Sequence, residues 1–174
     1  TRQDTLEANV LAAIQLQVKA ALDYDKLLDK LRGSEGEKNI RDQQNALITS
    51  LNLRLNGVSK KRTRLYEDYA EGLLDEAEYS FAKKSYDEQY ADLSRRLDEA
   101  VQRRSKFDEA MSVDNKWITL MKSVSTATQL SQDLVDESVE LVKVHEGGAV
   151  ELVMKYGDIY ELTIQSIKEV QEAM

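Results

Sequence analysis

Few residues in this 174-residue chain could carry out covalent or acid–base chemistry. His145 is the single histidine, and the chain has no cysteine. A general base or a metal centre needs partner groups within reach, and no cluster of ligands surrounds His145 in the sequence. We therefore expect an exposed histidine beside a turn, with no disulfide and no metal or other cofactor in this chain.

The remaining polar residues do not form the pattern of an active site. Carboxylates such as Asp87, Glu88 and Asp92 follow the spacing of a solvated helix face, and serines such as Ser80 and Ser94 have no histidine base available. The glycines are scattered, so no phosphate-binding loop is present. The sequence predicts no enzymatic activity for this chain.

Composition favours long helices. Charged residues make up 32% of the chain and apolar residues 41%, and there is no proline. This balance suits elongated helices better than a thick globular core. The net charge of −8 argues against broad nucleic-acid binding, and no apolar run reaches membrane-spanning length. Because the chain does not begin with Met, we expect a fragment of a longer protein.

The chain divides into three predicted segments. Residues 1–36 form an N-terminal helix over about 5–32, opened by an Asp4–Glu7 capping box and ended by a glycine-rich hinge. Residues 37–111 form a long antiparallel coiled-coil hairpin, with its tip near 70–78. The hairpin projects from a small α/β body. The expected fold class is thus mainly α with a small β-hairpin.

Heptad spacing defines the hairpin seam. The α-helical face of its first arm includes Leu47 and Leu51, with Arg54 and Lys61 near core positions. The second arm has one apolar seam and one polar companion seam. The apolar seam is Tyr79, Tyr86, Leu93, Ala100 and Phe107, and the polar seam is Gln89, Arg96 and Arg103.

Residues 112–174 complete the body. We expect a short helix capped by Asp114 and carrying Trp117 as a core anchor, then strands at about 138–145 and 149–156. The residues His145-Glu146-Gly147-Gly148 read as the turn between those strands. Asp158 and Glu161 are expected to cap the last helix.

The tip combines a stop signal with a restart signal. Gly72 tolerates the positive φ that ends a helix, and Asp75 with Glu78 forms a capping box for the next one. Leu74 can pack on Tyr79 as a hydrophobic staple, whereas Leu73 has no evident local partner. Apolar residues at the far end of a rod indicate a docking point. The predicted contact residues are Tyr69, Leu73, Leu74 and Tyr79.

Two basic runs and a set of tyrosines allow a further interpretation. The runs are Lys60, Lys61, Arg62 and Arg64, and Arg95, Arg96, Arg103, Arg104 and Lys106. Such runs are more often solvated faces, but the first is kept as a possible phosphate contact. The tyrosines that could stack on nucleic-acid bases are Tyr66, Tyr69, Tyr79, Tyr86 and Tyr90. Coiled-coil packing is the favoured explanation of that spacing.

The segment 64–79, RLYEDYAEGLLDEAEY, with Tyr86 after it, closely resembles the helical hairpin of large serine recombinases of the resolvase/invertase superfamily. These include phage integrases and transposon recombinases. The opening around Leu6 resembles the helix that follows their last zinc ligand, and the segment 139–145 resembles their closing strand. The resemblance is specific near 64–90 and diffuse elsewhere.

This resemblance implies a non-catalytic C-terminal part of a site-specific DNA recombinase. In that family the hairpins of different subunits touch through their tips, which helps to synapse two DNA sites and controls the direction of recombination. The implied partners are other recombinase subunits, DNA through the parent protein, and a directionality factor, with no membrane. The catalytic serine and the zinc cysteines would lie upstream, and a cytoplasmic location in a bacterium, phage or mobile element is implied.

Two other functions remain open. A generic cytoplasmic coiled-coil adaptor would bind a partner along the shaft of the hairpin. A chaperone-like module of prefoldin type also joins coiled-coil arms to β-hairpins. In prefoldin, however, the β-hairpins lie between the two helices and the helix ends are free, which differs from the order here.

Overall fold

The computed structural model describes residues 2–145 and 149–174, and it divides the chain into two compact units. The hairpin unit comprises Asn39–Ser105. The α/β unit comprises Thr1–Lys38 and Lys106–Met174. Helices dominate the described residues, with one two-stranded antiparallel sheet, which confirms the predicted fold class.

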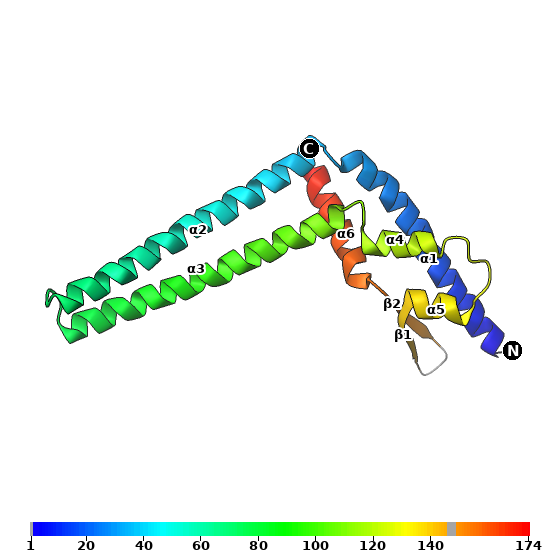
Figure 1. Cartoon of the computed structure of the whole chain (residues 1–174). Helices are drawn as coiled ribbons and strands as arrows, with labels where there is room; N and C mark the ends of the chain where they lie inside the picture. The colour runs from blue at the N-terminus through cyan, green and yellow to red at the C-terminus, as the bar shows by residue number, and fades with distance from the viewer. Residues whose placement is uncertain (1, 146–148) are drawn as a thin grey trace. The chain divides into compact units, whose positions relative to one another are not determined.

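The hairpin is made by α2 (Glu35–Ala70) and α3 (Glu76–Met111), which have 36 residues each. The two helices run antiparallel and side by side from a short turn, as Figure 1 shows. At 1.5 Å per residue each helix is about 54 Å long. A helical hairpin of this length was expected from the sequence.

A narrow apolar seam joins the two helices. Its buried residues are Leu51, Val58, Leu93 and Ala100, and partly buried Ile48, Leu55, Tyr86, Tyr90 and Leu97 pack against them. Residues on α3 therefore recur at alternating spacings of three and four, as knobs of a coiled coil do. The seam is one continuous apolar strip.

The predicted seam was partly wrong. Leu47 is 44% exposed, and Ile48 occupies the seam in its place. The polar companion residues Gln89, Arg96 and Arg103 are exposed, as are Arg54 and Lys61 of α2. Neighbours at i+3 and at i+4 share a helix face, so the pattern allowed either choice. Tyr90 and Leu97, at i+4 from Tyr86 and Leu93, bury apolar area that the polar i+3 residues cannot.

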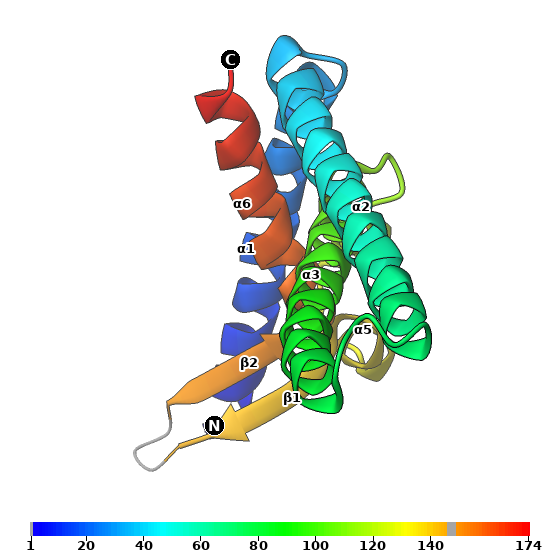
Figure 2. The ribbon, with the colours of Figure 1, turned by 90° about the vertical axis from the view of Figure 1, so that its left-hand side faces the viewer.

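The α/β unit packs α1 (Arg2–Leu31), α4 (Lys116–Ser123) and α6 (Gly157–Glu172) around a common core. Trp117 is fully buried, as predicted for a core anchor. Its ring centroid lies 4.7 Å from that of Tyr160 and 6.1 Å from that of Tyr24. An aromatic residue from each of the three helices thus meets in the centre of this unit. Figure 2 shows α1 and α6 side by side.

A β-hairpin follows α5 (Gln132–Ser138) in the α/β unit. Strand β1 (Val139–Val144) pairs antiparallel with β2 (Val150–Met154), so both are shorter than predicted. The predicted turn at Glu146–Gly148 lies outside the described residues. Beside it, the His145 N–H donates to the Ala149 carbonyl at 2.8 Å.

Two helices in the α/β unit begin at residues other than those predicted. Helix α1 already begins at Arg2, so Asp4 lies inside its first turn and does not cap it. Helix α2 begins at Glu35, earlier than expected, because Ser34 caps it. The Glu37 N–H donates to Ser34 Oγ at 3.2 Å, and Glu37 Oε2 accepts the Gly33 N–H. A serine cap with a glutamate three residues later is a capping box.

Two further caps differ from the predicted ones. Asn115, not Asp114, caps α4 and is only 1% exposed. Its Oδ1 accepts the Ile118 N–H, while its Nδ2 donates to the Ala110 carbonyl and to Thr163 Oγ1. Only an amide side chain both donates and accepts in this way. Helix α6 starts after Tyr156, which has a φ of 57° and gives no side-chain cap, so the predicted Asp158 cap was wrong.

A substitution at Gly36 tests the packing of the α/β unit. A Cβ there would lie 2.2 Å from the Val170 carbonyl oxygen of α6, whereas a Cβ at Gly57 of α2 meets nothing within 4 Å. We expect Gly36→Ala to destabilise the unit by about 1–3 kcal/mol. Gly57→Ala should stabilise the hairpin by about 0.5–1 kcal/mol, since alanine favours a helix interior. Denaturant unfolding followed by Trp117 fluorescence and by circular dichroism measures both. Equal changes in the free energy of unfolding for the two substitutions would contradict the close approach of Gly36 to Val170.

Candidate functional site: the hairpin tip

The chain leaves α2 through a Schellman motif. Gly72 has a φ of 76°, which an L side chain rarely adopts. The Leu73 N–H donates to the Asp68 carbonyl at 2.9 Å, and the Gly72 N–H donates to the Tyr69 carbonyl at 3.0 Å. These bonds satisfy carbonyls that the helix end would otherwise leave unpaired. The predicted stop signal at Gly72 is confirmed.

Helix α3 restarts with the predicted capping box. The Glu78 N–H donates to Asp75 Oδ1 at 2.7 Å, and the Asp75 N–H donates to Glu78 Oε2 at 3.0 Å. Each carboxylate also complements the positive end of the helix dipole. The whole turn is therefore tied down by local hydrogen bonds.

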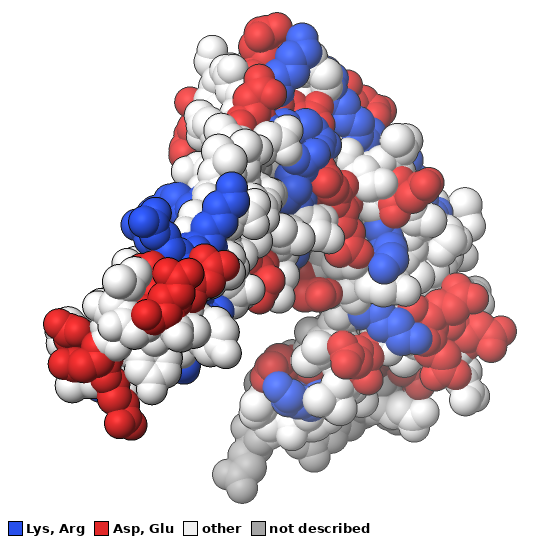
Figure 3. All heavy atoms as spheres, turned by 60° about the vertical axis from the view of Figure 1, so that its left-hand side comes forward, with Lys and Arg blue, Asp and Glu red and all other residues white. Residues whose placement is uncertain are grey.

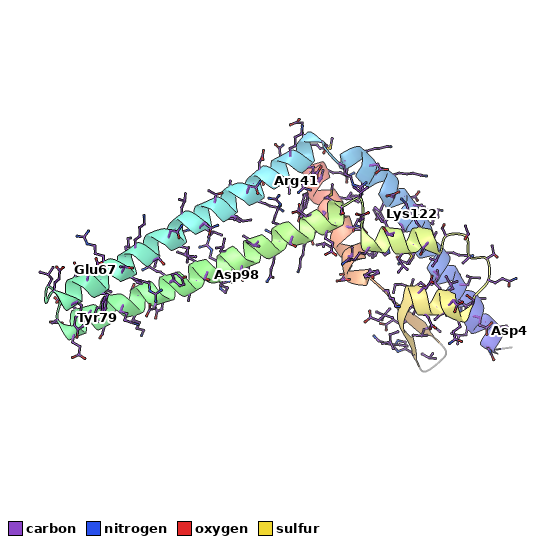
Figure 4. The ribbon with its side chains drawn as sticks, in the orientation of Figure 1. Asp4, Arg41, Glu67, Tyr79, Asp98 and Lys122 are labelled. Atoms are coloured by element: carbon purple, nitrogen blue, oxygen red, sulfur yellow. The ribbon has the colours of Figure 1, made fainter. Side chains whose placement is uncertain are left out.

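The four predicted tip contacts differ in how far their side chains are exposed. The rings of Tyr69 and Tyr79 stack with centroids 4.3 Å apart and planes 17° from parallel, so these two residues close the end of the hairpin. Leu74 is half-buried, and its packing on Tyr79 stays a prediction. Leu73 is 68% exposed. Figure 4 shows Tyr79 at the tip end of α3.

Two exposed aromatic residues near the tip were not predicted as contacts. Phe81 is 81% exposed and Tyr66 is 61% exposed. Tyr66 was expected to serve coiled-coil packing and does not. Both lie off the seam defined by Leu65 and Tyr79. Their angular position around the helix, away from the seam residues, is the sequence feature that could have identified them as exposed.

The first basic run is divided between two roles. Arg62 Nη2 lies 2.7 Å from Asp87 Oδ1 on α3, and its guanidinium lies 4.8 Å from the centroid of the Tyr90 ring. Arg62 is therefore a link between the helices. Lys60, Lys61 and Arg64 are exposed.

Asp87 is shared by two cations. Lys83 Nζ donates to Asp87 Oδ2 at 2.7 Å. This hydrogen bond lowers the pKa of the Asp87 carboxyl below its ordinary value and raises the pKa of Lys83. All three side chains border a groove of about 390 Å³ between α2 and α3. Its lining residues are Ser59, Arg62, Thr63, Leu65, Tyr66, Tyr79, Lys83 and Asp87.

Charge along the hairpin unit changes sign near the tip. Residues 65–82 contain six acidic residues and no lysine or arginine, whereas residues 59–64 contain four basic residues and no acidic one. Figure 3 shows acidic side chains at the end of the hairpin and basic ones next along the shaft. In the second basic run, Arg95 bridges Asp92 and Glu99 at 2.7 Å each. Arg104 bonds to Asn45 of α2.

The α/β unit contains a separate hollow of about 600 Å³ beside Trp117. Glu140, Asp158 and Glu161 lie around it together with Tyr160. The Trp117 Nε1–H is buried and has no hydrogen-bond acceptor among the described residues. No sequence pattern indicated this hollow.

His145 lies in the same unit, directly after the end of β1, and is exposed. His145 Nε2 lies 3.1 Å from Glu151 Oε2, and Lys143 donates to the same carboxylate. The Lys143 hydrogen bond, followed by that of His145, lowers the pKa of Glu151. Within residues 2–145 and 149–174, no three His, Asp or Glu side chains are placed to hold a metal ion. Over the same ranges no helix combines the length and apolarity needed to cross a membrane.

Replacing Asp87 tests the link between the helices. Asp87→Asn removes the carboxylate shared by Arg62 and Lys83, so we expect a lower free energy of unfolding at neutral pH. The pKa of Asp87 is lowered in the folded chain, so its contribution is complete above about pH 4 and is lost as pH falls through that lowered pKa. The free energies of unfolding of the wild-type chain and of Asp87→Asn should therefore converge in acid. Asp98→Asn, at an exposed position of the same helix, is the control. A difference that stays constant across pH would contradict this role.

Comparison with protein-family models, with curated proteins and with solved structures finds no match to this chain. The resemblance of residues 64–79 to the serine-recombinase hairpin therefore rests on those residues alone, and membership of that family stays a prediction.

Proposed function

We propose that this chain is the non-catalytic, coiled-coil part of a large serine recombinase. Its hairpin mediates contacts between subunits that synapse DNA sites and control the direction of recombination. The single observation that carries the proposal is the tip itself, a rigid turn that holds Leu73 68% exposed at the end of paired 36-residue helices. An apolar side chain displayed in this way suits a docking point for another subunit.

The chemistry of the tip favours a protein partner over DNA. Six acidic residues in 65–82 would repel phosphates. Lys60, Lys61 and Arg64 are exposed and remain the residues proposed for a phosphate contact, next along the shaft from the acidic tip. DNA cleavage and zinc binding belong to the parent recombinase, whose catalytic domain and zinc ligands would lie upstream. A directionality factor is the other proposed partner of the hairpin.

An adaptor function has one observation in its favour. Leu53 on the shaft of α2 is 68% exposed, and Val101 on α3 is 48% exposed. A coiled-coil adaptor would bind its partner along these shaft residues. Leu73 and Leu53 have the same exposed fraction, so substitutions at these two positions separate the two functions.

We expect Leu73→Asp to weaken association through the tip by about 2 kcal/mol, which is about 30-fold. The reason is that a carboxylate replaces the apolar anchor. Because Leu73 is exposed and contributes only its backbone N–H to the turn, folding should not change. The measurement is synapsis of two DNA sites by the full-length recombinase carrying the substitution, followed by gel mobility.

Leu53→Asp is the matched control, with the same exposure and the same change in charge. Synapsis should be unaffected by it. If Leu53→Asp impairs partner binding and Leu73→Asp does not, the adaptor function replaces the recombinase function. The gene offers an independent check. Paired cysteines should be encoded directly before Thr1 and a serine-nuclease domain further upstream, and a gene without them removes the recombinase proposal.

A further inference from the structure

The face of the hairpin opposite the groove carries an ordered set of charged and apolar groups, all exposed except Asp68, which is partly buried. On α2, Lys61, Arg64 and Asp68 follow one another at spacings of three and four, which places them along one face. On α3, Glu78 and Phe81 are three residues apart and share a face. Acidic groups lie toward the tip and basic groups further along the shaft.

Helical phase places these two rows on the same side of the hairpin. At 3.6 residues per turn, Leu65 lies between the row of Lys61 and Arg64 on one flank and the groove residue Arg62 on the other. Tyr79 likewise separates Glu78 from Lys83, which lines the groove. Both rows therefore lie on the face away from the groove, and this surface is called the charged face below.

The register of the hairpin places Phe81 between the acidic and basic groups. Tyr69 stacks on Tyr79, and Arg62 pairs with Asp87. These contacts put Phe81 level with about residue 68 of α2, one turn nearer the tip than Arg64. A phenylalanine that is 81% exposed in a helical hairpin has no role in the seam. We infer that an exposed phenylalanine at this position packs against an apolar surface of a partner.

We propose that two copies of this chain bind each other through the charged face in an overlapped, antiparallel arrangement. A twofold axis in the plane of the contact and perpendicular to the hairpins would place Asp68 of each copy on Lys61 and Arg64 of the other, because α2 then faces α2. The two Phe81 rings, both on α3, would be buried against each other. Such an isologous contact satisfies both charge clusters at once. This inference deepens the proposed function, on which it rests for the existence of a contact between hairpins.

Charge disfavours a head-on contact between two tips. Two tips that meet head-on would bring two sets of six acidic residues together, with no basic residue in 65–82 to offset them. Like charges placed across an interface oppose association. Moving each tip past the other by about 20 Å, which is about 14 helical residues, replaces that repulsion by two attractive contacts.

The test uses charge reversal in the 174-residue chain. The tip-reversed variant is Asp68→Lys with Glu71→Lys, and Glu71 is an exposed acidic residue that directly follows α2 at the tip. Both positions lie near the C-terminal end of α2, where cations are favourable for the helix dipole. The band-reversed variant is Lys61→Glu with Arg64→Glu. The controls carry the same charge changes at exposed positions away from the tip, and they are Asp42→Lys with Asp98→Lys, and Lys19→Glu with Lys168→Glu.

Sedimentation equilibrium at about 0.01 M and 0.15 M salt, where the Debye length is about 30 Å and 8 Å, measures the dissociation constant of the dimer. We expect the wild-type chain to dimerise more tightly at low salt. Each reversed variant should dissociate at least about tenfold more readily than its control. An equimolar mixture of the two variants should regain association, because each positive surface then meets a negative one. Phe81→Ser should weaken the dimer without changing the thermal midpoint measured at a concentration where both chains are monomeric.

Several results would overturn the overlapped dimer. A wild-type chain that stays monomeric at both salt concentrations would do so, and so would a band-reversed variant that dimerises as tightly as wild type. The latter result, with synapsis still impaired by Leu73→Asp, removes the overlap and leaves the proposed function standing. An overlap that is measured while Leu73→Asp leaves synapsis intact removes the proposed function instead.

Discussion

The hairpin depends on a seam only one apolar strip wide. Leu51, Val58, Leu93 and Ala100 are its buried core, and partly buried residues such as Leu55 and Tyr90 pack against them. Apolar burial of this extent stabilises the pairing of α2 with α3, but it specifies the register weakly. Polar links between the helices add contacts that only the observed register can make. Arg62 with Asp87 lies near one end of the unit, and Arg104 with Asn45 lies towards the other.

Because a narrow apolar seam and a few polar pairs join the two helices, the remaining surface of the hairpin can be charged. Surface ion pairs contribute little stability individually, yet each interhelical pair has a low cost when both partners remain solvated. The α/β unit uses the opposite arrangement. There Trp117 is fully buried against aromatic rings, and the buried Asn115 side chain bonds to Ala110, Ile118 and Thr163 of the same unit.

Features set by neighbouring residues could be predicted from the sequence. The positive φ of Gly72 and the Asp75–Glu78 box depend on residues within one turn, and the structure has both. The existence of the long helices and of the β-hairpin also followed from periodicity. Choices between equivalent local options could not be made in this way. The i+3 and i+4 neighbours of Tyr86 are both allowed by spacing, and only packing against α2 selects Tyr90.

Features that depend on distant residues were missed for a related reason. Asn115, not Asp114, caps α4, and its Nδ2 also donates to Thr163, which is 48 residues away and beyond any local pattern. The candidate site shows the same limit. Tyr69 and Tyr79 stay predicted contacts, and their stacking across the end of the hairpin could not be predicted from either residue alone. The exposure of Phe81 becomes evident only once the seam is known.

The closed turn at the tip has a consequence for kinetics. A flexible loop must lose conformational entropy when it binds, and that loss weakens affinity. Here backbone bonds at Gly72 and Leu73 and the reciprocal pair at Asp75 and Glu78 already hold the turn in one conformation. A partner therefore meets a preorganised surface. Because no ordering step precedes docking, the association rate is governed by diffusion and orientation, and a short-lived contact can form and release quickly.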